Sequence, residues 1–220
     1  MFFQRYLAVY LYIRPKCCIF AQLKRYILLH RFDDIHTHVA GGPGTILSVP
    51  ADEVGGLVAD NDDLDMAMRQ CYSLQLHPWH VTEARIAAFT EAAMRLRDDV
   101  QFVAVGECGL DGCCQTPEAL QHVAFRQALA VAGSLHKPVI VHCVKRWEEM
   151  LADVREVMGK PPVDGYEPPI ICHGFCKGVQ LAQRLLDAGL CISLGKNYKP
   201  EVAKMVPPQR LYRETDQEQG

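Results

Sequence analysis

Short apolar runs alternate with amphipathic stretches along most of this chain, and this alternation limits the possible folds more than any other feature. Eight runs rich in Val, Ile, Leu, Tyr and Phe have the length of buried strands. They begin at Phe32, Thr45, Tyr72, Gln101, Lys137, Pro169, Leu190 and Arg210. Short strands separated by helix-length segments are typical of parallel α/β sheets, so we expect that class of fold.

Several of the intervening segments carry the apolar period and the end signals of helices. Thr82 is the expected N-cap of one helix, and Thr116 followed by Pro117 is the expected start of another. Gly159 and Gly189 mark the expected ends of two more helices. The sequence therefore places helices after the third, fourth, fifth and sixth strands.

Eight parallel strands favour a TIM (β/α)8-type barrel, and residues 32–216 approach the lower size limit of about 200 residues for that fold. We expect a reduced barrel. The segment HVAGGPG between the first two strands is too short for a helix, which predicts a shortened first crossover. Residues 217–220 are too few for a last helix, which predicts that the eighth helix is missing. An open doubly wound sheet is the alternative.

Charge is distributed unevenly along the chain. Six of the 23 basic side chains and none of the 26 acidic ones lie in residues 1–31, so the rest of the chain is distinctly acidic. We expect residues 1–31 to form a basic, apolar N-terminal extension, helical or disordered, and residues 32–220 to form the barrel domain. An acidic barrel disfavours binding to extended duplex DNA, which depends on Lys and Arg replacing counterions.

The N-terminal extension has its own pattern. Beyond Pro15, apolar residues such as Ile19, Leu23 and Tyr26 recur at helical spacing. This pattern predicts a helix that packs on the barrel in place of the missing eighth helix. A helix lying on a membrane surface and an extension that contributes nothing to the fold are the alternatives.

Targeting signals and cysteine usage indicate the compartment. No run reaches the roughly 18 apolar residues of a membrane span, and no small-residue cleavage site follows the apolar N-terminus. The 10 Cys are too sparse for a disulfide framework, and several lie in apolar runs that predict buried strands. We therefore expect no transmembrane segment and a cytoplasmic location.

Histidines and carboxylates stand at the ends of the predicted strands. They are His36, His38, Glu107, His142, His173 and Asp216. In a TIM barrel the carboxyl ends of all strands meet at one mouth. A single strand-end histidine is more often a core residue, but six such groups together favour a metal site, because imidazole and carboxylate bind zinc, manganese and iron. His77 and Trp79 in the loop LHPWH could border this site.

Six ordered motifs resemble those of the TatD family of metal-dependent hydrolases. They are DIHTH, LHPWH, VAVGECGLD, PVIVHC, ICHGF and ETD. The resemblance covers about residues 32–216 and implies a TIM barrel with a binuclear metal site. Its implied ligands are His36, His38 and Asp216 for one divalent ion, His142 and His173 for the other, and Glu107 for both. The ions could be zinc, manganese or magnesium.

The resemblance also implies catalytic roles. Glu107 and Asp216 are the implied catalytic residues, and Asp216 would accept a proton from the attacking water. Cys143 and Val144 stand where the family usually has Ser-Arg, so the usual phosphate contact is absent. The remaining candidates for substrate binding are His77, Trp79, Lys145, Arg146 and Lys177.

The implied substrate is a phosphodiester, with single-stranded or frayed DNA ends preferred over extended duplex, as expected of a TatD-type deoxyribonuclease. Two alternatives stay open at this point. One is a metal-dependent ester or amide hydrolase, for example of the aminoacyl-tRNA deacylase type, because the same ions polarise a carbonyl. The other is a degenerate barrel that binds metal without catalysis. Nothing in the sequence indicates the oligomeric state.

Overall fold

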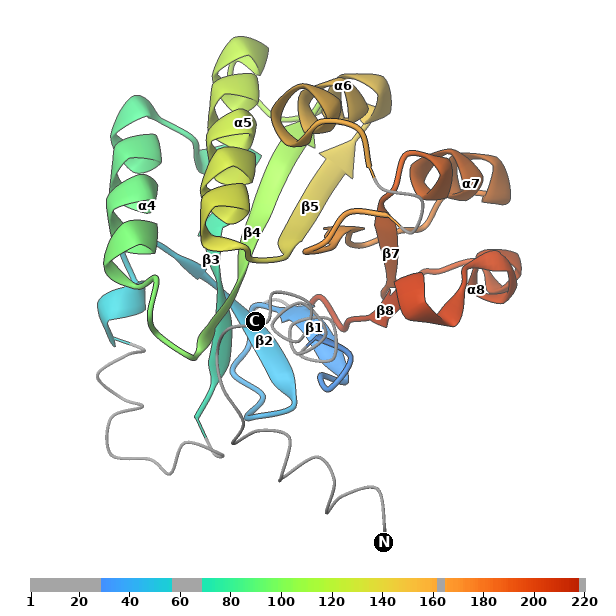
Figure 1. Ribbon diagram of the computed structural model, residues 1–220, viewed down its shortest axis with the longest axis horizontal. Coiled ribbons are helices and arrows are strands. Elements are labelled where there is room, and N and C mark those ends of the chain that lie inside the picture. The colour runs from blue at the N-terminus through green and yellow to red at the C-terminus, as the bar shows by residue number, and fades with distance from the viewer. Residues whose placement is uncertain (1–28, 57–68, 162–164, 218–220) are drawn as a thin grey trace, which may run out of the picture.

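The chain folds into a nearly closed parallel barrel with helices on its outer face. The structure, a computed structural model, describes residues 29–56, 69–161 and 165–217. Eight strands pair in the order of the sequence (Figure 1). They are β1 (Asp34–Thr37), β2 (Thr45–Pro50), β3 (Cys71–Leu76), β4 (Phe102–Asp111), β5 (Val139–Val144), β6 (Ile170–Cys172), β7 (Cys191–Leu194) and β8 (Leu211–Arg213). Every neighbouring pair is parallel.

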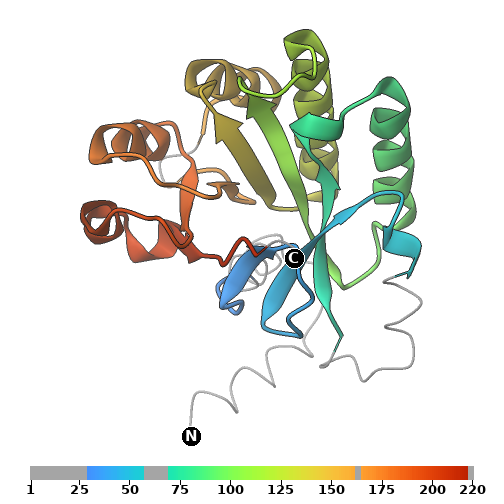
Figure 2. The ribbon, with the colours of Figure 1, turned by 180° about the vertical axis from the view of Figure 1, so that it is seen from behind.

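Helices cover the outside of the sheet (Figures 1 and 2). They are α4 (Glu83–Arg95), α5 (Glu118–Leu135), α6 (Trp147–Met158), α7 (Val179–Asp187) and α8 (Pro200–Met205), with the 3-10 helices η2 (Pro78–His80) and η3 (Pro208–Arg210). None of the helices in the described part has the length and apolar character needed to span a bilayer.

The barrel closes where the segment after β8 runs beside β1. The backbone N–H of Asp216 donates to the carbonyl oxygen of His36 at 3.1 Å. Two residues earlier on β1, the carboxylate of Asp34 accepts a hydrogen bond from the backbone N–H of Thr215 at 3.1 Å. These contacts confirm the predicted barrel over the open sheet, and they bring Asp216 to the same mouth as His36.

Two apolar layers hold the barrel together. The outer layer lies between the strands and the helices and contains large buried side chains such as Phe89 and Phe125. The inner layer fills the end of the barrel away from the mouth. Its members are Leu29, Phe32, Ile35, Ile46, Cys71, Val103, Ile171, Cys191 and Tyr212. The helix predicted in the N-terminal extension lies in residues 1–28, outside the described residues, and stays a prediction.

All eight predicted strands are present, and residues 38–44 between β1 and β2 contain no helix, as expected from their length. The Thr82 hydroxyl caps α4 as predicted, accepting from the backbone N–H of Arg85 at 3.1 Å. The predicted cap at Thr116 is wrong by one residue: α5 starts at Glu118 after Pro117, which has no side chain able to cap it. The Thr116 hydroxyl instead donates to the carbonyl oxygen of Trp79, at 3.2 Å.

Two glycines let β4 approach β5 on either side of Glu107. Gly106 and Gly109 have φ angles of 129° and 146°, in the region that favours glycine. A Cβ atom on Gly109 would lie 2.0 Å from the carbonyl oxygen of His142. One on Gly106 would lie 2.3 Å from that of Ile140. These two close approaches therefore hold β4 against β5 and fix the position of the strand that carries Glu107.

This close approach predicts opposite effects for the same substitution at two glycines. Gly109→Ala should lower the free energy of unfolding by about 2–4 kcal/mol, because the new Cβ meets backbone and the φ angle is unfavourable for alanine. Gly133→Ala, within α5, should raise it by about 0.5–1 kcal/mol, since alanine favours helix. The Cβ at Gly133 would meet only Met158, at 3.7 Å. Urea unfolding measures both, and equal effects would contradict the close approach of β4 and β5.

Candidate metal centre

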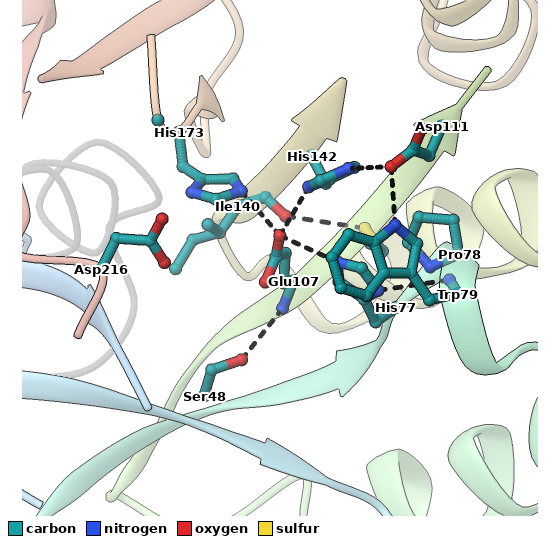
Figure 3. Close-up of polar contacts among 12 residues, drawn as sticks. Ser48, His77, Pro78, Trp79, Glu107, Asp111, Ile140, His142, His173 and Asp216 are labelled. Atoms are coloured by element: carbon teal, nitrogen blue, oxygen red, sulfur yellow. Dashed lines mark hydrogen bonds and ion pairs between the residues drawn. The ribbon is translucent and has the colours of Figure 1, made fainter. Parts of the chain in front are cut away.

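The Glu107 carboxylate lies at the centre of the barrel mouth, and its side chain is only 4% exposed (Figure 3). Its Oε2 atom faces the histidines of β1 and the loop after it. The Nε2 atom of His36 lies 3.2 Å from Oε2, and that of His38 lies 3.5 Å from it. Asp216 completes this side, with its Oδ1 atom 3.5 Å from Nε2 of His36.

The other carboxylate oxygen, Oε1, faces a different set of histidines. Nε2 of His173 lies 2.7 Å from it, and Nδ1 of His142 lies 2.8 Å from it. Nε2 of His77 lies 3.2 Å away. Figure 3 shows these three side chains converging on Glu107 from the ends of three strands. The two oxygens of one carboxylate thus point toward two separate groups of nitrogen ligands.

The donor atoms form compact groups that could hold cations. Within the described residues, three sets have donor atoms within 4.8 Å of one another. They are His36, His38 and Glu107; His36, His173 and Asp216; and His77, Glu107 and His142. Glu107 belongs to two of these sets and faces a different group of histidines with each of its carboxylate oxygens. The structure therefore brings together all six predicted ligand residues and adds His77.

The surroundings of the His36 ring show whether these residues fit a metal ion. It is fully buried, its Nδ1 atom has no hydrogen-bond partner among the described residues, and its Nε2 atom faces the carboxylates of Glu107 and Asp216 without hydrogen-bond geometry. The Nδ1 atom of His173 is also buried, and it lies 3.5 Å from Oε1 of Glu214 without hydrogen-bond geometry. Buried polar nitrogens normally have partners, because leaving them unpaired costs free energy. A divalent cation that accepts an imidazole lone pair would remove this cost, so the residues fit a metal.

The pKa values show that the mouth favours positive charge. Burial and the neighbouring His173 act to lower the pKa of His36, but Glu107 and Asp216 outweigh them and raise it to about 9. Burial also acts to raise the pKa of Glu107, yet His173 and His36 hold it well below its ordinary value. A cluster that stabilises charge of this sign suits a divalent cation, which binds neutral imidazole and ionised carboxylate.

Asp111, at the end of β4, is a candidate site residue that the sequence alone did not reveal. Its Oδ2 atom lies 3.0 Å from Nε2 of His142 and accepts a hydrogen bond from Nε1 of Trp79 at 2.6 Å. Burial acts to raise its pKa, but hydrogen bonds from Trp79 and the backbone N–H of Cys113 lower it overall. An ionised Asp111 can accept a hydrogen bond from Nε2–H of His142, and that tautomer leaves the Nδ1 lone pair available to a cation held beside Glu107.

A signal for Asp111 was present in the sequence. Asp111 follows Glu107 by four residues on one strand, and side chains at even spacing lie on the same face. Glu214 supports His173 in a similar way, with its Oε1 atom 3.5 Å from Nδ1 of that histidine. Glu214 also accepts a hydrogen bond from the backbone N–H of Gly174. Carboxylates of this kind fix the orientation of metal-binding histidines.

The residues predicted to bind substrate occupy different surroundings. Trp79 is 53% exposed, with its ring fixed by Asp111. Lys145 and Lys177 are exposed and form no ion pair within the described residues. Arg146 is engaged, since its guanidinium lies 3.1 Å from the carboxylate of Glu118. Lys145 and Lys177 are therefore better placed than Arg146 to meet a ligand.

Sequence comparison identifies a family and several relatives of this chain. The sequence model of TatD-related DNases matches residues 62–217. The 3'-5' ssDNA/RNA exonuclease TatD of Klebsiella pneumoniae is 32% identical over 158 residues, which cover 66% of this chain and 57% of that protein. The uncharacterized metal-dependent hydrolase YabD of Bacillus subtilis is 30% identical over 148 residues, 63% of this chain and 56% of that protein. The chain thus spans little more than half the length of these relatives.

Solved structures share the fold. The TATD homolog YJJV from Escherichia coli matches with a TM-score of 0.66 at 23% identity, covering 84% of this chain and 79% of that one. The hydrolase TatD family protein from Entamoeba histolytica matches with a TM-score of 0.65 at 18% identity, covering 89% of this chain and 64% of that one. These matches confirm the predicted TIM barrel.

The contacts of Asp111 predict a loss of metal affinity without loss of the fold. Asp111→Asn removes the charge that orients His142, so affinity for Zn²⁺ should fall by about 10–100-fold. Asp187→Asn makes the same change on the exposed surface of α7, where Asp187 accepts a hydrogen bond from Gln183, and should leave affinity unchanged. Competition with a chromogenic chelator measures both. Equal affinities of wild type and Asp111→Asn would show that Asp111 does not orient the site.

Proposed function

This chain belongs to the family of TatD-related DNases, and from that membership we propose that it is a divalent-metal-dependent hydrolase that cleaves phosphodiester bonds at single-stranded or frayed DNA ends. The observation that carries the proposal is the position of Glu107, whose two oxygens face separate sets of histidines. The related protein of Klebsiella pneumoniae is named as a nuclease for single strands, which supports this substrate class.

The proposal assigns two metal positions. His36, His38 and Asp216 would hold one ion, His142 and His173 the other, and Glu107 both. Two divalent ions bound there would supply the positive charge that stabilises the attacking and leaving oxygens of a phosphodiester. Nitrogen and carboxylate ligands suit zinc and manganese, and magnesium remains an alternative through the carboxylates. His77 is close enough to Glu107 to add a ligand or to donate a hydrogen bond to substrate.

The two central carboxylates have different surroundings, which supports different roles. The side chain of Asp216 is 44% exposed, whereas that of Glu107 is 4% exposed. Water can reach Asp216, so Asp216 is the proposed acceptor of the proton that a nucleophilic water loses. Glu107 is shielded from water and stays in place as the shared ligand. Asp111 and Glu214 hold His142 and His173 in orientation behind this centre.

The acidic character of the barrel supports short ends over extended duplex as substrate, since duplex binding requires many basic contacts. The proposal retains a cytoplasmic location. Supporting it are the free thiols of Cys108, Cys172 and Cys191, which are buried in strands as expected for structural cysteines of a reducing compartment.

Substitution of the shared ligand tests the proposal. Glu107→Gln keeps the shape of the side chain but removes its charge, so release of nucleotides from a labelled single-stranded oligonucleotide with Mn²⁺ should fall by about 100-fold or more. The matched control is Glu156→Gln on α6, which makes the same change at an exposed residue paired with Arg126. We expect the control to retain full activity.

Three results would contradict the proposal. Equal nucleotide release by wild type and Glu107→Gln would show that the activity does not come from this centre. Hydrolysis of aminoacyl or carboxylic esters by wild type, with no release of nucleotides from the oligonucleotide, would favour the ester hydrolase alternative. Metal uptake with neither activity would favour a barrel that binds metal without catalysis.

A further inference from the structure

A cavity of about 210 Å³ opens beside the candidate metal centre, at the ends of β6, β7 and β8. Asp216 and Glu214 form part of its wall, so it is continuous with the proposed reaction site. Its wall also includes Cys176, Lys196, Asn197 and Tyr198. The cavity is smaller than the roughly 300–1,000 Å³ of sites that enclose a whole small ligand. Its size suits one portion of a longer ligand that extends into the mouth.

Tyr198 presents an aromatic ring to this cavity. The guanidinium carbon of Arg213 lies 5.0 Å from the centre of the ring, within the range of a cation–π contact, so the ring is held in place on one side. Tyr198 is nevertheless 39% exposed. A ring that is both fixed and exposed offers a stacking surface at little cost in side-chain entropy.

The second exposed aromatic side chain of the described residues also stands at the mouth. Trp79 is 53% exposed, and its indole nitrogen donates to Asp111, which in turn contacts His142. Trp79 follows β3 and Tyr198 follows β7, and these strands are separated by four positions in a barrel of eight. The two rings therefore stand on opposite sides of Glu107, where a strand lying across the mouth would meet both.

Lys196 supplies a positive charge in the same cavity. It is exposed and pairs with no carboxylate within the described residues. Flexible single strands are bound by aromatic rings that stack on bases and by basic groups that contact the phosphates. Tyr198 and Lys196 provide one of each beside Asp216.

We propose that this cavity is the subsite for one nucleoside next to the scissile phosphate, with its base stacked on Tyr198 and an adjoining phosphate paired with Lys196. The inference rests on the proposed phosphodiester hydrolysis and specifies where the strand lies. It also explains a preference for single-stranded ends, because a base must leave its pair to reach the ring. Trp79 provides the stacking surface for the strand on the opposite side.

Binding of two small probes to the full chain supplied with Mn²⁺ tests the subsite. Thymidine 5′-monophosphate and 2-deoxyribose 5-phosphate share a phosphate and a sugar, but only the first has a base. By calorimetry, wild type should bind the nucleotide about 10-fold more tightly, as expected for one stacked base. Tyr198→Ala should remove this preference, and Tyr198→Phe, which keeps the ring, should retain it.

The contact between Lys196 and the phosphate is tested with a matched control variant. Lys196→Ala should weaken binding of both probes by the same factor, because both carry the phosphate. Lys204→Ala removes an identical charge from the exposed surface of α8, outside the cavity, and should change neither affinity.

The possible results separate the subsite from the proposed function. Equal affinity of wild type for the two probes, or a base preference that survives in Tyr198→Ala, would overturn the subsite. Oligonucleotide hydrolysis accompanied by either result would leave the proposed function standing without it. A base preference lost in Tyr198→Ala, in a protein that hydrolyses no oligonucleotide, would support the subsite and contradict the proposed hydrolysis.

Discussion

A buried carboxylate surrounded by imidazoles is the constraint on which the mouth of this barrel depends. Glu107 is almost fully shielded from water and has five histidine rings close to its two oxygens. A buried charge is costly unless neighbouring charges compensate it. Here the compensation comes from cations or protons held by the same histidines. The acids behind them, Asp111 and Glu214, add further negative charge, so the cluster as a whole favours divalent metal.

The barrel brings these groups together through a few local features. Gly106 and Gly109 let β4 lie against β5, which places Glu107 beside His142. The segment after β8 pairs with β1 and so brings Asp216 to His36. Each of these contacts joins residues far apart in the sequence. Closure of the barrel and assembly of the site thus depend on the same contacts. A change that opens the sheet also separates the ligands.

The sequence was sufficient for the framework and for the six central residues. Apolar runs identified each strand, and the strand-end histidines met because parallel strands end on one side of a barrel. The sequence alone was insufficient for residues whose role depends on contacts between segments far apart in the chain. Asp111 contacts His142 on β5 and Trp79 in η2, and Tyr198 lies on a loop with no periodic pattern. Thr116 was misassigned as a cap because its hydroxyl donates to the carbonyl oxygen of Trp79 in η2.

The central claim is that one carboxylate joins two metal positions. A crystal structure of the Mn²⁺-loaded protein, with anomalous difference maps recorded at the manganese edge, tests this claim most directly. The account predicts two peaks at the barrel mouth, one beside each oxygen of Glu107, the first also touching His36 and the second also touching His142 and His173. A single peak, or peaks that do not contact Glu107, would contradict it.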